Sequence, residues 1–286
     1  MLNWDDLRHF VILAREGTLS GAARALGVDH VTVARRVAAL ERATSLKLVD
    51  RRARSYQLTE DGQRVAAAAA PMEQAAFAVE RAAQARRTGL DGKVTISAPP
   101  ALANALIAPR LIDLRRQHPG IIITLIGEKR TASLGRREAD LALRLSRPVE
   151  SGLVTRKIGG FGFSLYGAPT YLRETPPSQL AFIAYDASMD DAPQQKWLKA
   201  IAGNRDIVLL ASDLENQAAA ARAGVGLAAL PHFLGEGDAS LIRYESGQSA
   251  INRDVWLVVH RDISRAPVIR AIMDFLTNCL KADRSR

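Results

Sequence analysis

The stretch GTLSGAARALGVDHVTVARRVAALE (residues 17–41) contains a break between two apolar helical patterns, and this break constrains the fold more than any other feature. Gly27 ends the first pattern, because glycine tolerates the positive φ of a helix C-terminus. Asp29 is suited to cap the next helix. Two helices joined by a short turn that contains glycine are typical of a helix-turn-helix. The residues at helical spacing are Leu19, Ala22, Ala23 and Leu26 in the first helix (residues 18–26), and Val33, Val37 and Leu40 in the second.

Positive charge gathers around the second of these helices. The chain of 286 residues has a net charge of +9, and residues 30–55 hold seven bases against two acids, a local charge of +5. A basic cluster of this kind attracts a polyanion and indicates a nucleic-acid partner. The alternative is a solvated basic face with no partner.

The neighbouring segments predict the rest of a small N-terminal domain. Residues 4–14 are predicted to form a helix capped by Asn3. Alternating apolar residues predict a β-hairpin with a basic tip at residues 51–55. The alternating residues are Leu46, Leu48, Tyr56 and Leu58. Thr59 is expected to cap a long helix that reaches Arg87. Pro71 is expected to bend or break that helix, because an interior proline removes a hydrogen bond.

The segment TGLDGK (88–93) is the predicted domain boundary, since the periodicity changes after it. Short apolar runs then alternate with helical patterns up to the closing helix PVIRAIMDFLTNCL. Strands that are apolar throughout and separated by helices predict a parallel sheet covered on both faces. Residues 89–286 are many for one such sheet, so we expect two subdomains.

The residue types that catalysis or metal binding would need are scarce. Cys279 is the single cysteine, which excludes an intramolecular disulfide and fits a reducing compartment. The five histidines are scattered, and the sequence has no phosphate loop, zinc-protease motif or nucleophile elbow. We therefore predict no enzyme, no cofactor and no metal. The N-terminus carries acids instead of the bases of a signal peptide, so we expect a cytoplasmic, unexported protein without a membrane segment.

Residues 10–62, FVILAREGTLSGAARALGVDHVTVARRVAALERATSLKLVDRRARSYQLTEDG, resemble the LysR-type transcriptional regulators. The segments HPGIIITLIG, READLALRL, ARAGVGLAALP and WLVVHRD are similar to the effector-binding domain of that family, so the resemblance covers most of the chain. The resemblance implies an α/β fold with an N-terminal all-α winged helix-turn-helix (1–59), a linker and dimerisation helix (60–88) and an effector-binding domain (89–286). That last domain is expected to resemble periplasmic binding proteins, with subdomain I at about 93–162 plus 264–286 and subdomain II at about 163–263.

The second helix of the motif is expected to enter the major groove of DNA. Arg35 is the best candidate for a base or phosphate contact, with Thr32 and His30 for finer readout. Ser20 is placed either to bind phosphate or to cap its own helix. The full set of expected DNA-binding residues is Ser20, His30, Val31, Thr32, Arg35, Arg36, Arg51, Arg52 and Arg54. One arginine of the hairpin is also a candidate partner for Asp50, and the sequence departs from common family choices at His30, Val31 and Ala34.

By resemblance, the linker helix pairs two chains, so that two reading helices meet a pseudo-palindromic operator in double-stranded DNA. Val65, Met72 and Val79 lie one heptad apart and are the predicted dimer seam, although packing within one chain would use the same spacing. A dimer or tetramer is therefore expected. RNA polymerase is a further candidate partner.

A small-molecule effector is expected between the two subdomains, where strand ends and helix N-termini face a crevice. Effectors of the family are often carboxylates, so a carboxylate is one candidate. The expected effector-binding residues are Pro99, Pro100, Ala101, Glu128, Lys129, Arg130, Thr131, Arg144, Phe161, Tyr185, Asp186 and Asn216. For several of them a structural role is equally open: surface charge for Lys129 and Arg130, core packing for Tyr185, and a local backbone bond for Asn216.

Two other functions compete with a regulator. An enzyme could use the same crevice, but the glycine-rich stretches GGFG and GVG lack the rest of a nucleotide-binding pattern. A ligand receptor that has lost DNA binding would not be expected to keep the basic helix and hairpin. A steep loss of DNA affinity with salt would favour the regulator, and turnover of a small molecule without DNA would favour the enzyme.

Overall fold

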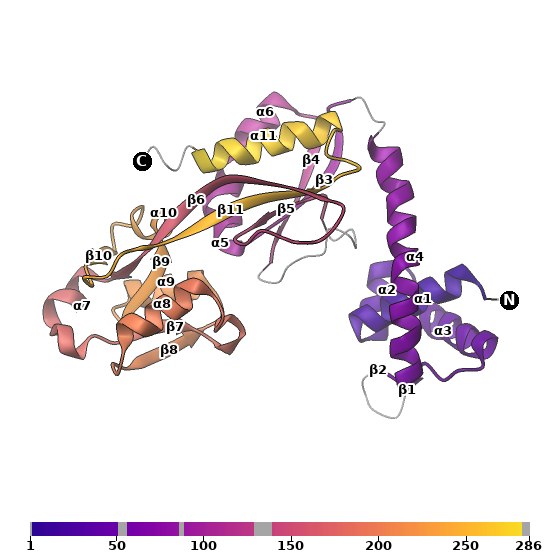
Figure 1. The fold of residues 1–286 in the computed structure, drawn as a ribbon, viewed down its shortest axis with the longest axis horizontal. Coiled ribbons are helices and arrows are strands. Elements are labelled where there is room, and N and C mark those ends of the chain that lie inside the picture. The colour runs from indigo at the N-terminus through magenta and orange to yellow at the C-terminus, as the bar shows by residue number, and fades with distance from the viewer. Residues whose placement is uncertain (1, 51–55, 86–88, 129–138, 282–286) are drawn as a thin grey trace. The chain divides into compact units, whose positions relative to one another are not determined.

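The structure is a computed structural model that describes residues 2–50, 56–85, 89–128 and 139–281, without the side chains of residues 71, 73, 74, 77, 78 and 80–85. The chain divides into two compact units, residues 1–81 and 82–286 (Figure 1).

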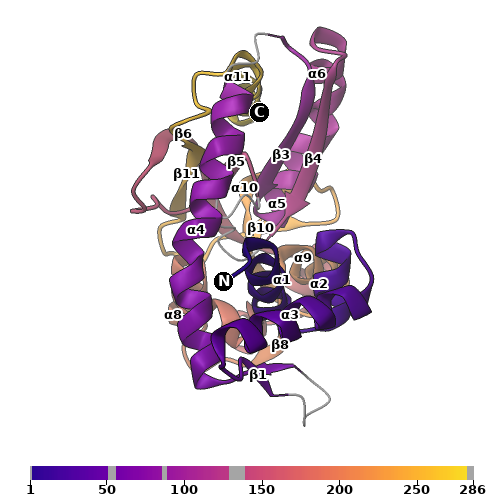
Figure 2. The ribbon, with the colours of Figure 1, turned by 90° about the vertical axis from the view of Figure 1, so that its right-hand side faces the viewer.

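Three short helices form the body of the first unit, which Figure 2 shows from a second side: α1 (Trp4–Glu16), α2 (Leu19–Leu26) and α3 (His30–Thr44). The Asn3 side chain accepts a hydrogen bond from the N–H of Asp5, and Asp29 accepts one from Thr32. Both predicted caps are thus confirmed. Thr18, predicted as the first residue of its helix, lies before α2 and caps it by accepting from the N–H of Gly21.

Gly27 makes the turn between α2 and α3. Its φ is +68°, in the left-handed region, and its N–H donates to carbonyl groups in the last turn of α2. No heavy atom lies within 4 Å of the place where a Cβ would be. The predicted helix end is confirmed, and the position calls for glycine because of its backbone conformation and not for lack of space.

The core of the first unit consists of the predicted apolar stripes. Phe10 of α1 and Val33 and Leu40 of α3 have no exposed surface. Burying side chains of this size contributes about 1.5–3 kcal/mol each. The three helices are therefore held at fixed angles by one shared core.

The β-hairpin is shorter than the alternation predicted. It pairs β1 (Val49–Asp50) with β2 (Gln57–Leu58) in antiparallel register, and its tip lies outside the described residues. Of the residues expected in the strands, Leu46 and Leu48 precede β1, Tyr56 precedes β2, and Leu46 is exposed. The reason is local, because Glu41 of α3 accepts hydrogen bonds from the N–H groups of Leu48 and Val49 and fixes the chain there.

The long helix α4 (Glu60–Ala85) begins where predicted and continues through Pro71. The Thr59 hydroxyl accepts a hydrogen bond from the N–H of Gly62, which confirms its capping role. Gly62 also lies against the residue that precedes β1, since a Cβ at this glycine would be 2.1 Å from the carbonyl oxygen of Leu48. The proline therefore does not break the helix, and the hairpin packs closely on its first turn.

The described strands of the second unit form one nine-stranded sheet in the order β4-β3-β5-β11-β6-β9-β7-β8, with β10 paired to β6. Their bounds are β3 (Gly92–Ala98), β4 (Ile121–Gly127), β5 (Leu141–Arg144), β6 (Leu153–Gly167), β7 (Phe182–Tyr185), β8 (Ile207–Ala211), β9 (Leu227–Pro231), β10 (Ile242–Tyr244) and β11 (Ile251–His260).

The prediction of a parallel sheet is correct at the two ends of the sheet and wrong in its middle. The pairs β3 with β4 and β7 with β9 are parallel, whereas β6 and β11 run antiparallel to each other and to their outer neighbours. Apolar character on both faces shows that helices cover a strand, but it carries no information about direction. The two long strands join the halves of the unit (Figure 1).

Helices cover the sheet in two separate groups. On the first half, α5 (Pro100–Leu102) continues through a π-helical and a 3-10 turn into α6 (Leu111–Gln117), and α11 (Pro267–Lys281) packs beside it. On the second half lie α7 (Pro169–Glu174), α8 (Pro193–Ala202), α9 (Leu214–Arg222) and α10 (His232–Gly235). No described helix is both long and apolar enough to span a bilayer.

Each half of the second unit has its own core. In the first half, the strand residues Ile96 and Leu257 pack with Ile272 of α11. In the second, Phe182 of β7 packs with Leu198 of α8, and Ile183 packs with Ala218 of α9. The second unit is therefore a two-subdomain α/β structure, as predicted.

Candidate nucleic-acid interface and ligand cavity

The N-terminal half of α3 presents an exposed surface. His30, Val31 and Arg35 are exposed, and the Val31 side chain lies 64 % open to solvent. The apolar stripe of the same helix is buried beneath them. These three belong to the residues that were predicted from the sequence to contact DNA, whereas Thr32 and Arg36 of the same set are partly buried.

The first turn of α3 is held by Asp29. Its carboxylate accepts from the N–H of Thr32 at 2.7 Å and from the Thr32 hydroxyl at 2.8 Å. These hydrogen bonds hold the pKa of Asp29 below its usual value. The Thr32 hydroxyl is a donor to Asp29, so it can offer a base only its acceptor side in this arrangement.

Arg36 is a structural residue as well as a DNA candidate. Its guanidinium forms ion pairs with the carboxylates of Asp5 and Asp6 on α1, each at 3.1 Å. Because Asp6 is buried, its ion pair with Arg36 contributes more to stability than an exposed ion pair would. Arg36 thus contributes to the angle at which α3 is presented.

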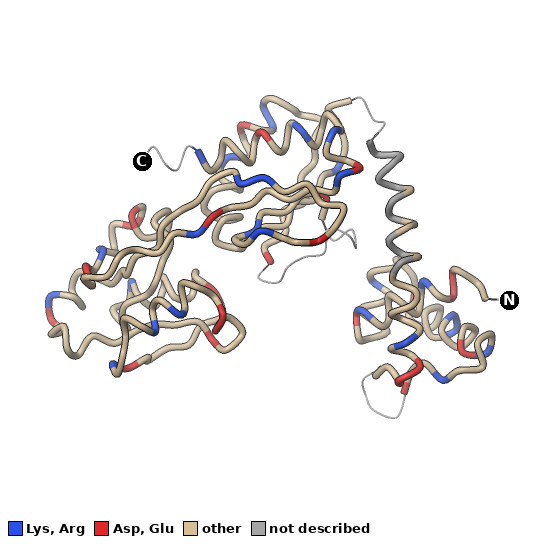
Figure 3. Tube along the Cα trace, in the orientation of Figure 1, with Lys and Arg blue, Asp and Glu red and all other residues tan. Residues whose placement is uncertain are grey.

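Ser20 had two open roles, and the cap of α2 is taken by Thr18, whose hydroxyl accepts from Gly21 at 3.0 Å. Ser20 remains exposed on the first turn of α2. The arginines of the hairpin, Arg51, Arg52 and Arg54, lie outside the described residues. Figure 3 marks the other lysines and arginines along the Cα trace.

The predicted seam residues of α4 differ in their surroundings. Val65 packs against the core of the first unit. Met72 and Val79 are 47 % and 72 % exposed. Packing within the described part of the first unit therefore accounts for the apolar character of Val65 but not for that of Met72 and Val79.

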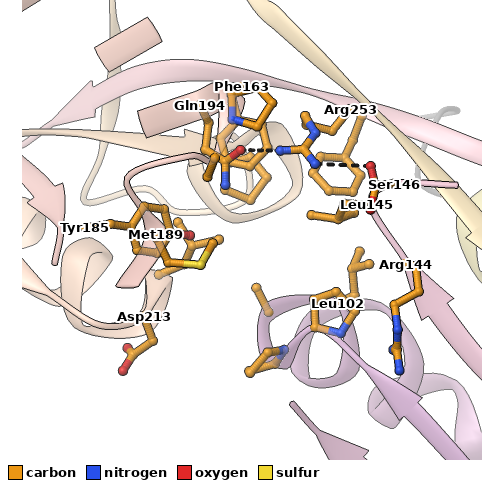
Figure 4. A pocket seen from close by; sticks show the side chains of 18 of the residues that line it. Leu102, Arg144, Leu145, Ser146, Phe163, Tyr185, Met189, Gln194, Asp213 and Arg253 are labelled. Atoms are coloured by element: carbon orange, nitrogen blue, oxygen red, sulfur yellow. Dashed lines mark hydrogen bonds between the residues drawn. The ribbon is translucent and has the colours of Figure 1, made fainter. Parts of the chain in front are cut away.

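A cavity of about 490 Å³ lies between the two halves of the second unit (Figure 4). Its apolar walls come from both halves and include Leu102 of α5, Phe161 and Phe163 of β6, and Met189. This is the size and character of a small-molecule site. Of the predicted effector-binding residues, the cavity is lined by Pro99, Pro100, Ala101, Glu128, Arg144, Phe161 and Tyr185.

The other predicted effector residues do not line the cavity or lie outside the described residues. Asp186 caps the turn that follows β7 by accepting from Ser188. Asn216 donates to the carboxylate of Asp213, so it serves the cap of α9. Lys129, Arg130 and Thr131 belong to the part of the chain that the structure does not describe.

Arg253 is the most informative cavity residue that sequence reasoning missed. Its guanidinium donates to the carbonyl oxygen of Leu145 at 3.1 Å and to the side-chain oxygen of Gln194 (Figure 4). Leu145 follows β5 in the first half, whereas Gln194 belongs to α8 in the second. The side chain of Arg253 on β11 thus bridges both halves. In the sequence, the feature that could have indicated this residue is a single arginine near the start of an apolar strand.

A second arginine lies deeper in the first half. Arg144 is buried and donates to the Ser97 hydroxyl at 3.2 Å. Ser97 in turn donates to the carboxylate of Glu128 at 3.5 Å. This chain of contacts places one carboxylate of the cavity beside the end of β3.

Tyr185 has a structural role beside its place in the wall. Gln195 accepts from the Tyr185 N–H at 3.0 Å and donates to its carbonyl oxygen at 2.9 Å. Burial raises the pKa of the Tyr185 hydroxyl, so this group remains a neutral hydrogen-bond donor. No group of metal-binding side chains occurs among the described residues.

Comparison with known proteins accounts for both units. Residues 4–63 match the model of the bacterial regulatory helix-turn-helix protein, lysR family, and residues 87–280 match the LysR substrate binding domain. The chain is 26 % identical to the Mau operon transcriptional activator of Paracoccus denitrificans, over 96 % of this chain and 95 % of that protein. It is 30 % identical to the AhcY transcriptional activator HvrB of Rhodobacter capsulatus, over 77 % of each.

Solved structures show the same fold. The full-length structure of the Vibrio cholerae virulence activator AphB matches with a TM-score of 0.63 at 23 % identity, covering 97 % of this chain and 99 % of that one. At this identity the likeness concerns the fold alone.

Proposed function

The chain belongs to the LysR-type family of transcriptional regulators, and from this premise we propose how its residues divide the work of regulation. Members of the family are regulators and not enzymes; they bind DNA and small-molecule effectors and form oligomers. The proposal concerns which residues read DNA, which hold the effector and which join two chains.

The first unit docks α3 into the major groove of an operator. Arg35 contacts a base or phosphate, His30 and Thr32 refine the readout, and Val31 offers methyl groups to thymine. Ser20 and the hairpin arginines Arg51, Arg52 and Arg54 bind the DNA backbone or the minor groove. The observation that carries this proposal is the exposed first half of α3, which Asp29 caps and Arg36 ties to α1.

The cavity of the second unit holds the effector. A carboxylate on that molecule is a suitable partner for Arg253, whose guanidinium donates only to uncharged acceptors among the described residues. Because Arg253 bridges the two halves, a ligand that binds it changes the contacts between them. That change in the balance of conformations would alter operator contacts.

Two chains pair through α4, with Met72 and Val79 in the seam, and present two copies of α3 to a pseudo-palindromic operator. RNA polymerase is the partner through which the bound regulator acts on transcription.

Selection of genomic fragments by the full-length protein, followed by sequencing, tests this proposal. We expect a site with two-fold symmetry, bound with an affinity that falls steeply as salt rises, because phosphate contacts release counterions. Uniform recovery of fragments without a shared site would contradict it.

A further inference from the structure

The cavity between the two halves is charged in an unusual way for a site that would take a simple carboxylate. Of the described residues that line it, two are arginines and four carry carboxylates. The arginines are Arg144 and Arg253, and the acids are Glu128, Asp191, Asp213 and Glu215. A simple anion would meet an excess of negative charge, and a simple amine would have to lie near two guanidinium groups.

Arg253 forms no ion pair among the described residues, although the charge of Asp254 acts on it. Its two hydrogen-bond acceptors are a backbone carbonyl and an amide side chain. The nearest acid in the sequence, Asp254, pairs instead with Lys157 at 2.7 Å. Burial lowers the pKa of Arg253, which means that the charged form loses solvation there. A carboxylate from a ligand would supply the ion-pair partner that Arg253 lacks among the described residues.

The acids are not equally available. Asp191 pairs with Lys196 at 2.9 Å, and Asp213 accepts from the N–H and side chain of Asn216. Glu128 and Glu215, by contrast, form no ion pair with any residue of the described chain; Glu128 accepts only from Ser97. Both are partly buried, one in each half of the unit. These two carboxylates are the places where a ligand cation would be stabilised.

Groups of both charges line the cavity. Figure 4 shows Arg144 on one side and Asp213 opposite, with Arg253 beside Phe163 and Gln194. Glu215 is in the first turn of α9, directly after the turn that holds Asp213. Between them lie apolar walls made by Leu102, Phe161 and Met189 among others. A molecule that fits this lining carries one charge of each sign together with an apolar part.

We propose that the effector is a zwitterion with an apolar body, an α-amino acid or a close derivative, whose carboxylate binds Arg253 and whose ammonium group binds Glu128 or Glu215. The inference rests on the proposed role of the cavity as the effector site. It adds the chemical class of the ligand and the residues that select it. A zwitterion satisfies both charges at once, whereas a molecule with one charge leaves the opposite group unpaired.

Calorimetric titration of the full-length protein with matched probes tests the proposal. One set is phenylalanine, hydrocinnamate and phenethylamine; the other is leucine, isocaproate and isoamylamine. The three compounds of a set share one apolar body. The first carries both charges, the second only the carboxylate and the third only the ammonium group. The other amino acids found in proteins are titrated as further zwitterions. We expect at least one amino acid to bind about tenfold or more tightly than its one-charge analogues.

Variants then identify the groups that select the ligand. Arg253→Gln should weaken binding of the amino acid and of its carboxylate analogue alike. Glu128→Gln or Glu215→Gln should weaken the amino acid about tenfold while leaving the carboxylate analogue unchanged or tighter, which a merely structural defect would not do. Glu174→Gln and Arg173→Gln, on the exposed surface of α7, make the same chemical changes away from the cavity and should have no effect.

Two results would overturn the proposal. One is binding of a carboxylate or an amine as tightly as the amino acid with the same body. The other is the absence of binding by every amino acid tested. In either case a protein that still binds its operator keeps its place as a regulator, so failure of the ligand class is distinct from failure of the proposed function.

Discussion

At the scale of single residues, neighbours in the sequence have different tasks. Arg35 and Arg36 are both bases on α3, and both were expected to bind DNA, with Arg35 as the best candidate. The structure leaves Arg35 exposed and places Arg36 between Asp5 and Asp6 of α1. Sequence could predict the basic helix from its composition. It could not predict the structural role of Arg36, because the partners of this residue lie on another helix.

Replacing each arginine by alanine should separate these roles. Arg35→Ala should weaken operator binding by about 1–3 kcal/mol and relax one base position, without a change in stability. Arg36→Ala should lower the free energy of unfolding of the first unit by about 1–3 kcal/mol, since buried Asp6 loses its partner. Gel-shift titrations and urea unfolding measure the two effects. Equal loss of stability in both variants would refute the division.

The cap at Asp29 should make the stability of α3 depend on pH. Its pKa is lowered in the folded protein, so its contribution is complete above the unfolded pKa and is lost as pH falls through the folded one. Asp29→Ala should therefore be less stable than the parent at pH 7. This gap in the free energy of unfolding should narrow as the pH falls below about 4.

Urea unfolding followed by Trp4 fluorescence, with Trp197 and Trp256 replaced by phenylalanine, measures this gap. Asp29→Asn is the matched control, because asparagine caps a helix without titrating in this range. A gap between parent and Asp29→Ala that stays constant with pH would show that the charge of Asp29 is not involved.

At the scale of elements, the turn between α2 and α3 requires a residue that adopts a positive φ. Gly27 has a positive φ and open space around it. Gly27→Ala should cost about 1–2 kcal/mol, the penalty of a left-handed conformation for a residue with a Cβ. Gly27→Asn should cost less, because asparagine adopts this conformation more readily. Thermal unfolding compares the two. Equal stability of the alanine variant and the parent would mean that the turn can relax.

Local elements were more predictable than long-range ones, for a physical reason. Caps and turns such as Asn3, Gly27 and Thr59 depend on neighbours within a few residues, so their pattern is visible in the sequence. The antiparallel pairing of β6 with β11 joins segments far apart in the chain, and no local pattern records it. Of the cavity, the segments after β3 and β4 were predictable as strand ends. Arg253 was missed because its partners, Leu145 and Gln194, lie far from it in the sequence.

At the scale of the whole molecule, we propose that two chains pair through α4. Val79→Glu should weaken dimerisation and, with it, operator affinity, since a charge would be buried between two helices. Gln63→Glu adds the same charge at an exposed position of the same helix and should leave both unchanged. Sedimentation analysis measures the association. A dimer of undiminished stability in the Val79 variant would place the seam elsewhere.

The course of β11 and α11 also bears on how the protein is made. Both elements complete the core that begins with β3, so Ile96 packs against residues synthesised much later, such as Leu257 and Ile272. On the ribosome, the first half of the second unit must therefore wait with its apolar strands uncovered while the second half emerges and can fold first. A chain released before α11 would leave that core open and become a substrate for chaperones and proteases. Only complete translation products would then enter the pool that senses the effector.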